Sequence, residues 1–513
     1  MPTEEMVTPS PAPNSVAIAT ACARYDAAPP YAPGKAYPEY PFADRAALCP
    51  SNPVYCAVRE SLRLLGLDAP NYGTKQWNPF QGLVQPGHAV LLKPNFIREF
   101  RETREGHGDC LVTHGSVIRA ILDYAYIALG GRGRIIIADA PNSDADFEAI
   151  CRITGLREIQ EFYRRQAGFE VEVCDLRPER AEKIDGVIVG HERLPGDPAG
   201  YVTVDLGRLS AFAEVKHLCH LFYGAEYDTA ELRQHHHDDV HEYLVSQTVL
   251  AADCVINLPK LKTHKKTGLT ACMKNLVGIN GNKNWLPHHR EGTPAQGGDQ
   301  FADDGLLHRI ERSAVAGFKR AFPLLGPLRR AVAGPVKTVG RRIFGDTNTD
   351  AIRSGNWYGN DTTWRMVIDL NRILFYADAQ GRLHDRPARR VLNVVDAVVC
   401  GEGNGPVDPT PKPVGAILAG FNPVAVDLAC ARLMGFDYRR IPMLHRSLQD
   451  HPLPLCQFGY EDVICRSVEN QFHRPLWELD GKCLSFMPHF GWVGHVEWNP
   501  SAMSRGRENA CAV

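Results

Sequence analysis

The chain has 513 residues, of which 44% are hydrophobic and 23% charged, and its formal net charge is −2. This composition is ordinary for a globular protein, and a nearly neutral chain lacks the positive field of a nucleic-acid binder. Nucleic acid is therefore not an expected partner, and any recognition of an anion must be local. No segment approaches the roughly 20 apolar residues that cross a bilayer, and the first residues do not resemble a signal peptide, so we expect a cytoplasmic protein.

The 15 cysteines are scattered singly, with no C-x-x-C pair. This pattern favours reduced thiols in a cytosolic protein over a disulfide framework. It also lacks the C-x-x-C-x-x-C run of a ferredoxin-type iron–sulfur cluster.

Five segments of different composition follow one another. Residues 1–50 are rich in proline and alanine and predict an extended arm with little core of its own. The segments after it are a first α/β region at 51–284, an insertion with polar loops at 285–385, the second part of the α/β core at 386–450 and a C-terminal extension at 451–513.

Apolar periodicity predicts helices and strands that alternate along the chain, and each strand pattern is almost wholly apolar. Helices are predicted at 54–68, 116–131, 242–252 and 267–279, strands at 88–96, 134–144, 168–176 and 253–262, and residues 390–436 repeat the pattern. This alternation predicts an α/β fold of mainly parallel sheets covered by helices, and we expect two lobes with a cleft between them.

Polar residues follow each predicted strand directly. Ligands of open α/β sheets bind outside the carboxyl ends of the strands, so these residues predict one composite site. They are Lys93, Pro94 and Asn95; Asp139, Pro141 and Asn142; Lys260, Lys262, Thr263 and His264; and Glu402, Gly403, Asn404 and Gly405.

The lysine-rich segment PKLKTHKK stands where a carboxylate or phosphate would be held. Lysine is a compact charge whose pKa falls on burial, so it suits either an anion clamp or a proton carrier. The residues expected to bind the substrate are Lys93, Asn95, Lys260, Lys274 and Asn275, and Lys262 is expected to be catalytic. The alternative is a run of solvated surface lysines, which is the preferred interpretation for Lys265 and Lys266.

His114 and His264 each follow a threonine, at the end of a predicted strand or loop. Two imidazoles in one cleft could form an acid/base pair or bind a divalent metal, and the alternative is a structural role for each. Glu402 is expected to be a second acid/base group, and Asp427 is a further carboxylate for acid/base work or a hard cation. HHHDD at 235–239 is interpreted as a surface loop.

Two polar loops at 288–301 and 354–365 interleave glycine with aromatic residues. Aromatic and hydrogen-bonding side chains together suit a sugar or nucleobase pocket, and the alternative is a turn that packs its tryptophans inward. The substrate-binding residues expected from the second loop are Trp357, Asn360, Asp361 and Arg365.

A basic stretch at 317–342 carries seven Lys or Arg residues and no acid. Its proline interruptions exclude a single long helix. Short basic helices of this kind could form a lid over the site or rest on an anionic membrane at the inner face of the cell.

The segments LLKPNF, ADCVINLPKLKTHKKTGLTACMKNLVGI and VVDAVVCGEGNGP resemble the DUF362 family, over about residues 85–445. Many members of that family carry a ferredoxin-type cluster domain, whose motif this chain lacks. The pattern LKPN…TH is also distantly similar to the N-terminal part of nickel-pincer lactate racemases, and no cofactor is carried over from that likeness.

These patterns predict an enzyme for a small or sugar-like anionic substrate, acting by acid/base chemistry (isomerase or epimerase) or by metal-assisted transfer or hydrolysis. The cofactor stays open, with a divalent metal as one option. A second hypothesis is a non-catalytic scaffold of a polysaccharide or lipid-linked assembly at the membrane. A third is a redox protein that builds a cluster from separate cysteines such as Cys254, Cys272 and Cys400.

Overall fold

The computed structural model describes residues 12–42, 52–100, 108–184, 187–224, 229–305, 351–479 and 484–499, with single positions between 308 and 343. The basic stretch 317–342 lies almost entirely outside the described residues. The lid and the membrane contact expected of it therefore stay predictions.

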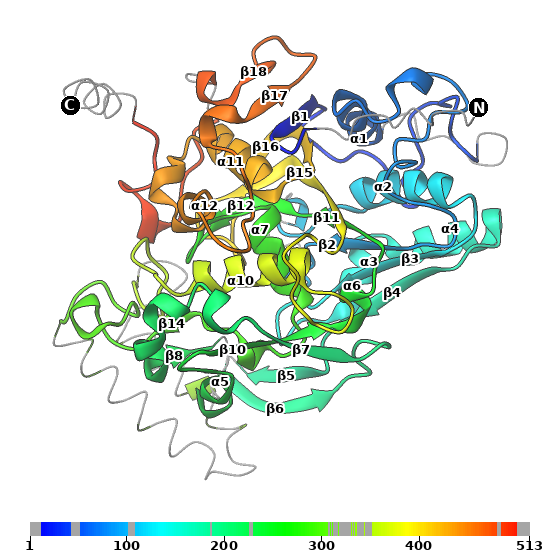
Figure 1. Ribbon diagram of the computed structural model, residues 1–513. Coiled ribbons are helices and arrows are strands. Elements are labelled where there is room, and N and C mark those ends of the chain that lie inside the picture. Colours follow the sequence, from blue (N-terminus) through cyan, green and yellow to red (C-terminus); the bar gives the residue numbers. More distant parts are fainter. Residues whose placement is uncertain are drawn as a thin grey trace.

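A large central sheet organises the molecule (Figure 1). Five neighbouring strands, β15, β11, β2, β3 and β4, run parallel, and β16 pairs antiparallel with β15. In spatial order the strands are β18 (Arg474–Pro475), β17 (Ile464–Arg466), β1 (Ser15–Thr20), β16 (Thr410–Gly420), β15 (Arg390–Glu402), β11 (Cys254–Leu258), β2 (Ala89–Pro94), β3 (Arg134–Asp139) and β4 (Val171–Asp175).

The predicted α/β class with a mainly parallel sheet is confirmed. The predicted division into two lobes is not, because β15 of the later part of the chain pairs with β11 of the earlier part in one continuous sheet.

Helices cover both faces of the sheet, because alternate residues of each buried strand point to opposite sides. Leu91 of β2 enters one core, whereas Val90 and Leu92 enter the other. The helices of the second core are α1 (Pro53–Leu64), α2 (Gly115–Leu129), α3 (Phe147–Ile153) and α4 (Leu156–Ala167). Those of the first core are α7 (Cys272–Asn275), α10 (Thr363–Tyr376), α11 (Pro423–Met434) and α12 (Pro442–Ser447).

Local signals explain where the predicted helices begin and end. The Asn52 side chain accepts a hydrogen bond from the Tyr55 N–H at the start of α1, and His114 accepts one from the Ser116 N–H at the start of α2. Helix α2 ends at Gly130, which has a φ of 56°, a conformation that favours glycine. The helix predicted at 116–131 is thereby confirmed.

Two predicted helices are wrong. Residues 242–252 form strand β10 (Val240–Ser246) and then the short α6 (Gln247–Leu250), because His241, Tyr243 and Val245 alternate inward with the period of a strand. The helix predicted at 267–279 begins instead as β13 (Gly268–Thr270), which forms a hairpin with β12 (Lys260–His264). Only α7 and a following 3-10 turn are helical there.

The N-terminal segment also differs from the expected arm. Strand β1 lies inside the sheet between β16 and β17, and four of its six residues are buried apolar side chains. Both of its strand partners come from the C-terminal part of the chain, so the local proline-rich composition did not reveal the pairing.

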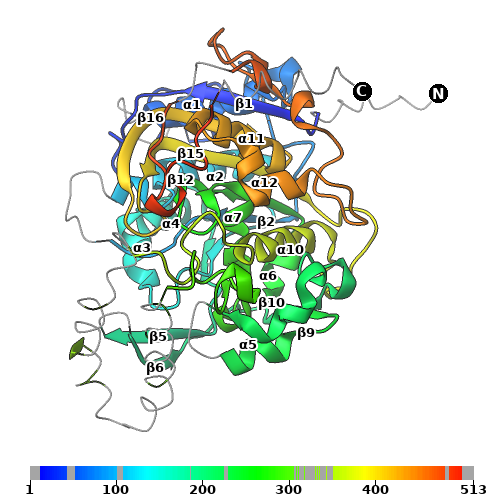
Figure 2. The same ribbon diagram turned by 90° about the vertical axis from the view of Figure 1, so that its left-hand side faces the viewer.

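Shorter sheets form a second layer at the end of the molecule away from β1 (Figure 2). They are β7 (Tyr201–Asp205), β10 and β9 (His236–His237); β5 (Glu179–Ile184) with β6 (Val187–Arg193); and β8 (Phe222–Tyr223) with β14 (His289–Arg290), beside α5 (Thr229–His235). Within the described ranges, no helix combines the length and apolarity needed to span a bilayer.

Candidate functional site

A buried ion pair joins the carboxyl ends of two adjacent parallel strands. Lys93 stands near the end of β2 and Asp139 ends β3, and the Lys93 Nζ lies 2.7 Å from Asp139 Oδ1. The other carboxylate oxygen accepts the Phe96 N–H at 2.8 Å. Burial lowers the pKa of Lys93, although the neighbouring Asp139 opposes that shift. This pair is the centre of the candidate site.

The backbone of Gly278 packs directly against this ion pair. Its carbonyl accepts the Ala140 N–H at 2.9 Å, which brings its backbone against the end of β3. A Cβ at this position would lie 1.9 Å from Asp139 Oδ1 and 2.7 Å from Lys93 Nζ. Only glycine therefore fits here. Sequence reasoning missed this role, since nothing local in KNLVGI signals a close approach to another strand.

Lys262 lies in β12, which continues the path of β11. Its side chain is fully buried, and its Nζ donates to the Leu111 carbonyl at 2.5 Å and to Asn95 Oδ1 at 3.3 Å. It forms no ion pair within the described part of the chain. Burial, together with the charges of Lys260 and Lys274, lowers the pKa of Lys262 to about 7.

Two half-buried lysines complete the group. The Lys283 Nζ donates to the Ala140 carbonyl at 2.9 Å, and burial lowers its pKa to about 7. Burial and the charge of Lys93 lower the pKa of Lys274 to about 8. The Lys274 ammonium makes no hydrogen bond or ion pair with any described residue. Lys283 was not predicted, because it follows a loop rather than a strand.

We call Lys93, Lys262, Lys274 and Lys283 the lysine cluster. The Asp139 carboxylate raises the pKa of Lys262, Lys274 and Lys283 and pairs with Lys93, so it is their shared counter-charge. One carboxylate at the carboxyl edge of the sheet thus pairs with Lys93 and acts electrostatically on the other three lysines.

His264 lies beside the lysine cluster and is 6% exposed. Its Nδ1 accepts the N–H groups of Lys266 and Thr267 at 3.1 and 3.2 Å. Burial, followed by the charges of Lys274 and other lysines, lowers the pKa of His264 well below its ordinary value. Lys266, predicted to be solvated, is instead buried, and its pKa falls to about 7.

His114 and Lys260 belong to a neighbouring group around Tyr25 and Asp396. Lys260 Nζ lies 2.8 Å from Asp396 Oδ2 and donates to the Tyr25 hydroxyl at 2.6 Å. The His114 ring stacks on Tyr25 at 3.9 Å, and burial lowers its pKa to about 3. His114 and His264 make no contact in the portion of the chain that the structure describes. The structure therefore groups His264, but not His114, with Lys262.

Removing the Tyr25 hydroxyl should destabilise the protein measurably. Tyr25→Phe removes the hydrogen bonds that the Tyr25 hydroxyl makes with Lys260 and Asp396, both of which are fully buried. We expect the free energy of unfolding in urea to fall by about 1.5–3 kcal/mol, the range for hydrogen bonds to charged groups. Tyr358→Phe is the control, because Tyr358 is 44% exposed, and it should change stability by less than about 0.5 kcal/mol. Equal stability of both variants would contradict the Tyr25 contacts.

Other predicted site residues are held by contacts within the protein. Glu402 accepts Lys412 Nζ at 2.9 Å in the β15–β16 hairpin. The Asn275 amide donates to the Lys93 carbonyl at 3.0 Å and to Asn257 Oδ1 at 2.8 Å, which ties α7 to two strands. Asp427 accepts the N–H groups that start α7, and burial raises its pKa to about 7.

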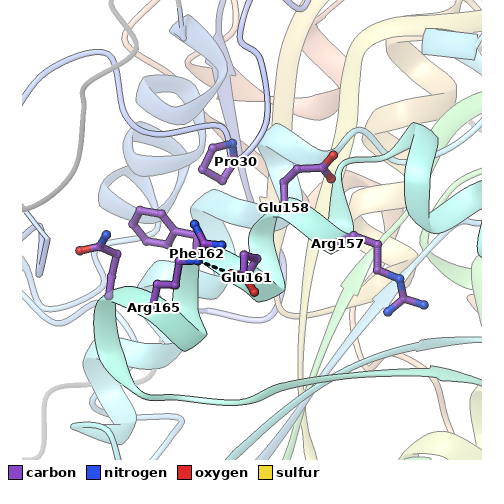
Figure 3. Close-up of a pocket in the computed structure, with 7 residues that line it drawn as sticks. Pro30, Arg157, Glu158, Glu161, Phe162 and Arg165 are labelled. Carbon is purple, nitrogen blue, oxygen red and sulfur yellow. Dashed lines mark ion pairs between the residues drawn. The ribbon is translucent and has the colours of Figure 1, made fainter.

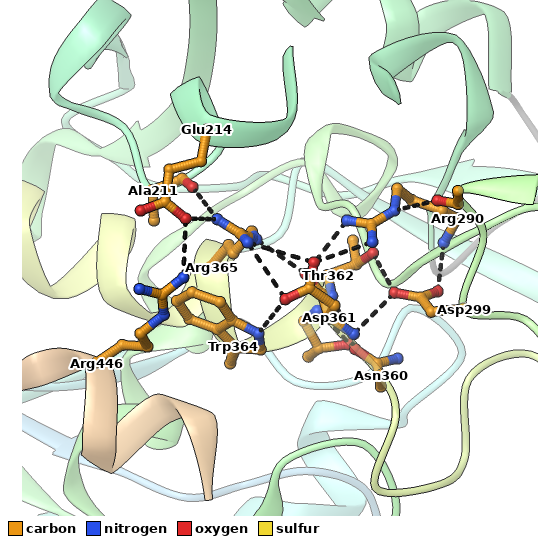
Figure 4. A network of polar contacts seen from close by, with 12 residues as sticks. Ala211, Glu214, Arg290, Asp299, Asn360, Asp361, Thr362, Trp364, Arg365 and Arg446 are labelled. Atoms are coloured by element: carbon orange, nitrogen blue, oxygen red, sulfur yellow. Dashed lines mark hydrogen bonds and ion pairs between the residues drawn. The ribbon is translucent and has the colours of Figure 1, made fainter. Parts of the chain in front are cut away.

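The loop residues predicted to bind a sugar form one polar network (Figure 4). Asp361 pairs with Arg290 at 2.9 Å and with Arg365 at 3.2 Å. Trp357 is buried and donates its indole N–H to the Asp299 carbonyl. The Asn360 amide donates to the His288 carbonyl at 3.0 Å, which also accepts Lys266 Nζ at 3.2 Å. This shared carbonyl joins the network to the region beside the lysine cluster.

The histidines and cysteines do not assemble a metal site where the structure describes them. No group of three or more His, Cys, Asp or Glu side chains there could hold a metal ion. Cys254 lies near Arg390, and Cys272 lies beside Asp427 at the start of α7. Burial raises the pKa of both thiols.

A surface hollow of about 440 Å³ lies on α4, apart from these groups (Figure 3). Its lining includes Arg165 and Glu161, which pair with each other, and Phe162. It shares no residue with the lysine cluster.

Comparisons with known proteins give a match to one family model but point to no activity. Residues 187–432 match the model of a family described as "Domain of unknown function (DUF362)". No curated protein matches. Five chains of solved structures match, among them a structural-genomics protein from Thermotoga maritima at 10% identity and a TM-score of 0.27. The match covers 72% of this chain and 57% of that one, and so low a TM-score supports no statement about function.

Proposed function

We propose that this protein, whose residues 187–432 match the DUF362 family model, binds a small oxyanion in the lysine cluster and acts on it by acid/base chemistry. The observation that carries the proposal is the Lys274 ammonium. It has no partner among the described residues, and it lies among three other lysines that share one carboxylate.

Charge balance supports an anion as the ligand. A buried ammonium without a counter-charge is costly, and the lysines respond by losing protons more easily. A carboxylate, sulfate or phosphate group beside Lys274 would supply the missing negative charge and accept several N–H bonds. Lys262 and Lys283 already donate to backbone carbonyls, so Lys274 is the side chain with the most freedom to contact a ligand.

The lowered pKa of Lys262 supports acid/base chemistry. A group with a pKa of about 7 exchanges protons readily at neutral pH, which suits a general base or acid. Proton transfer next to a carboxylate, as in an isomerase or epimerase, is the reaction class that such a lysine fits best. The scaffold hypothesis depends on residues 317–342, almost all outside the described ranges, and stays a prediction from the sequence.

Calorimetric titration with sulfate and with acetate tests the proposal, because neither ion changes its charge between pH 7 and 9. Binding should take up protons and should weaken as pH rises through the lysine pKa values of about 7 and 8. Each proton taken up weakens binding by up to about tenfold per pH unit. Titration in two buffers of different ionisation heat measures the proton uptake.

Lys274→Met should lower the affinity for the ion at least about tenfold, whereas the exposed Lys75→Met control should bind as the unmodified protein does. The proposal is wrong if neither ion binds, or if Lys274→Met binds them unchanged.

A further inference from the structure

Two imidazoles beside the lysine cluster, those of His264 and His288, carry their protons on different ring nitrogens. His264 Nδ1 accepts two backbone N–H groups, from Lys266 at 3.1 Å and Thr267 at 3.2 Å. A nitrogen that accepts these bonds carries no proton. The proton of a neutral His264 ring is therefore on Nε2, which becomes a hydrogen-bond donor.

His288 has the opposite arrangement. Its Nδ1 lies 2.8 Å from the Leu286 carbonyl, which can only accept, so Nδ1 carries the proton. The Nε2 of a neutral His288 ring is therefore an acceptor. His288 was not singled out among the predicted catalytic residues, because it follows no strand and no motif.

The charge of His288 contributes to the lowered pKa of His264, so the two rings lie in one region. Lys266 contacts both residues: its backbone N–H donates to the His264 ring at 3.1 Å, and its Nζ donates to the backbone carbonyl of His288 at 3.2 Å. Thr363 donates to the same carbonyl at 2.7 Å, which holds the His288 backbone in place. Neither Nε2 atom bonds to any residue in the described ranges.

Both rings are neutral at physiological pH. Burial is the main cause that lowers each pKa well below the ordinary value of histidine. The charge of Lys274 contributes to both shifts, so both rings lie within the electrostatic influence of its ammonium group. The donor on His264 and the acceptor on His288 are therefore stable features of the site.

We propose that the oxyanion bound at Lys274 also carries a hydroxyl group, which accepts from His264 Nε2 and donates to His288 Nε2. A hydroxyl suits this position because its one oxygen can donate and accept at once. The inference rests on the proposed function, since the anion beside Lys274 positions the hydroxyl. It narrows the ligand class from any small oxyanion to a hydroxylated one.

A matched pair of probes tests the inference. Glycerol 3-phosphate is n-propyl phosphate with two added hydroxyl groups, so their affinities at pH 7.5 differ only through those groups. Two hydrogen bonds to the imidazoles should make glycerol 3-phosphate bind about tenfold more tightly. Calorimetric titration of the full-length chain measures both.

His264→Asn and His288→Asn serve as the variants, because the asparagine amide can replace the Nδ1 contact of each ring while Nε2 is removed. Each variant should lose the tenfold preference for glycerol 3-phosphate over n-propyl phosphate. The exposed His217→Asn is the control and should keep the preference.

The outcomes separate the two proposals. Equal binding of both phosphates, a preference that survives both variants, or binding of sulfate alone would overturn the hydroxyl inference and leave the anion site standing. If neither the phosphates nor sulfate binds, the proposed function itself fails.

Discussion

Gly278→Ala should lower the free energy of unfolding by about 3–5 kcal/mol, the range for breaking a buried ion pair. The added methyl group would meet Asp139 Oδ1 at 1.9 Å and Lys93 Nζ at 2.7 Å, so the two side chains cannot keep their contact. The strands cannot move apart to relieve the clash, because β2 and β3 are hydrogen-bonded within the sheet. Urea denaturation followed by circular dichroism measures the loss.

The control for that variant is Gly82→Ala. Gly82 is exposed and a Cβ there meets nothing within 4 Å, so the change in stability should stay within about 0.5 kcal/mol. A Gly278→Ala protein as stable as the Gly82→Ala control would contradict the close approach of the Gly278 backbone to the ion pair.

Asp139→Asn should also cost about 3–5 kcal/mol at pH 7, because Lys93 then remains buried without its counter-charge. The loss should shrink as pH rises. In the folded state the pKa values of Lys262 and Lys283 are about 7, below the value near 10.4 of an unfolded chain. The unfolded state therefore holds more protons above pH 7, and stability rises by up to about 1.4 kcal/mol per pH unit for each such lysine.

Denaturation at pH 7.0, 7.4 and 7.8 tests this dependence. The window ends there because unfolded thiols lose their protons toward a pKa of about 8.5, whereas the buried thiols, whose pKa values are raised, keep theirs and oppose the trend. The unmodified protein should show the same direction of change, and a slope of zero or below in Asp139→Asn would contradict the charge balance of the lysine cluster.

A double variant distinguishes the loss of the Lys93–Asp139 ion pair from a general disruption of the fold. Lys93→Met combined with Asp139→Leu removes both charges, so it should recover most of the stability lost by Asp139→Asn. Sulfate should stabilise Asp139→Asn more than the unmodified protein, since that variant has the larger excess of positive charge.

The strands and several helices could be predicted because their signals are local. Runs such as VLL in β2 and RIIIAD in β3 are apolar on both faces, as buried parallel strands require. Helix α11 carries its own start and stop, with Asn422 at its N-terminus and Gly435 after its last turn. Lys93, Lys262 and His264 were likewise predicted from one rule, that ligands bind at the carboxyl ends of strands.

The same rule could not decide which of these residues share a site. His114 and Lys260 also follow strands or loops, yet Asp396 and Tyr25 hold them in a separate group. Asn275 lies beside the lysine cluster, but its amide bonds to Asn257 and to the Lys93 backbone. Such partners come from distant parts of the chain, so no local pattern reveals them.

The α/β class, most strands of the sheet and the concentration of lysines at one edge followed from the sequence alone, because apolar periodicity and strand ends are local properties. The place of β1 in the sheet and the contributions of Lys283, Gly278 and His288 became visible only in the folded chain, as did the lack of a partner for Lys274 among the described residues. The reason is physical: burial and charge pairing depend on every side chain that surrounds a group, and those neighbours meet only when the chain has folded.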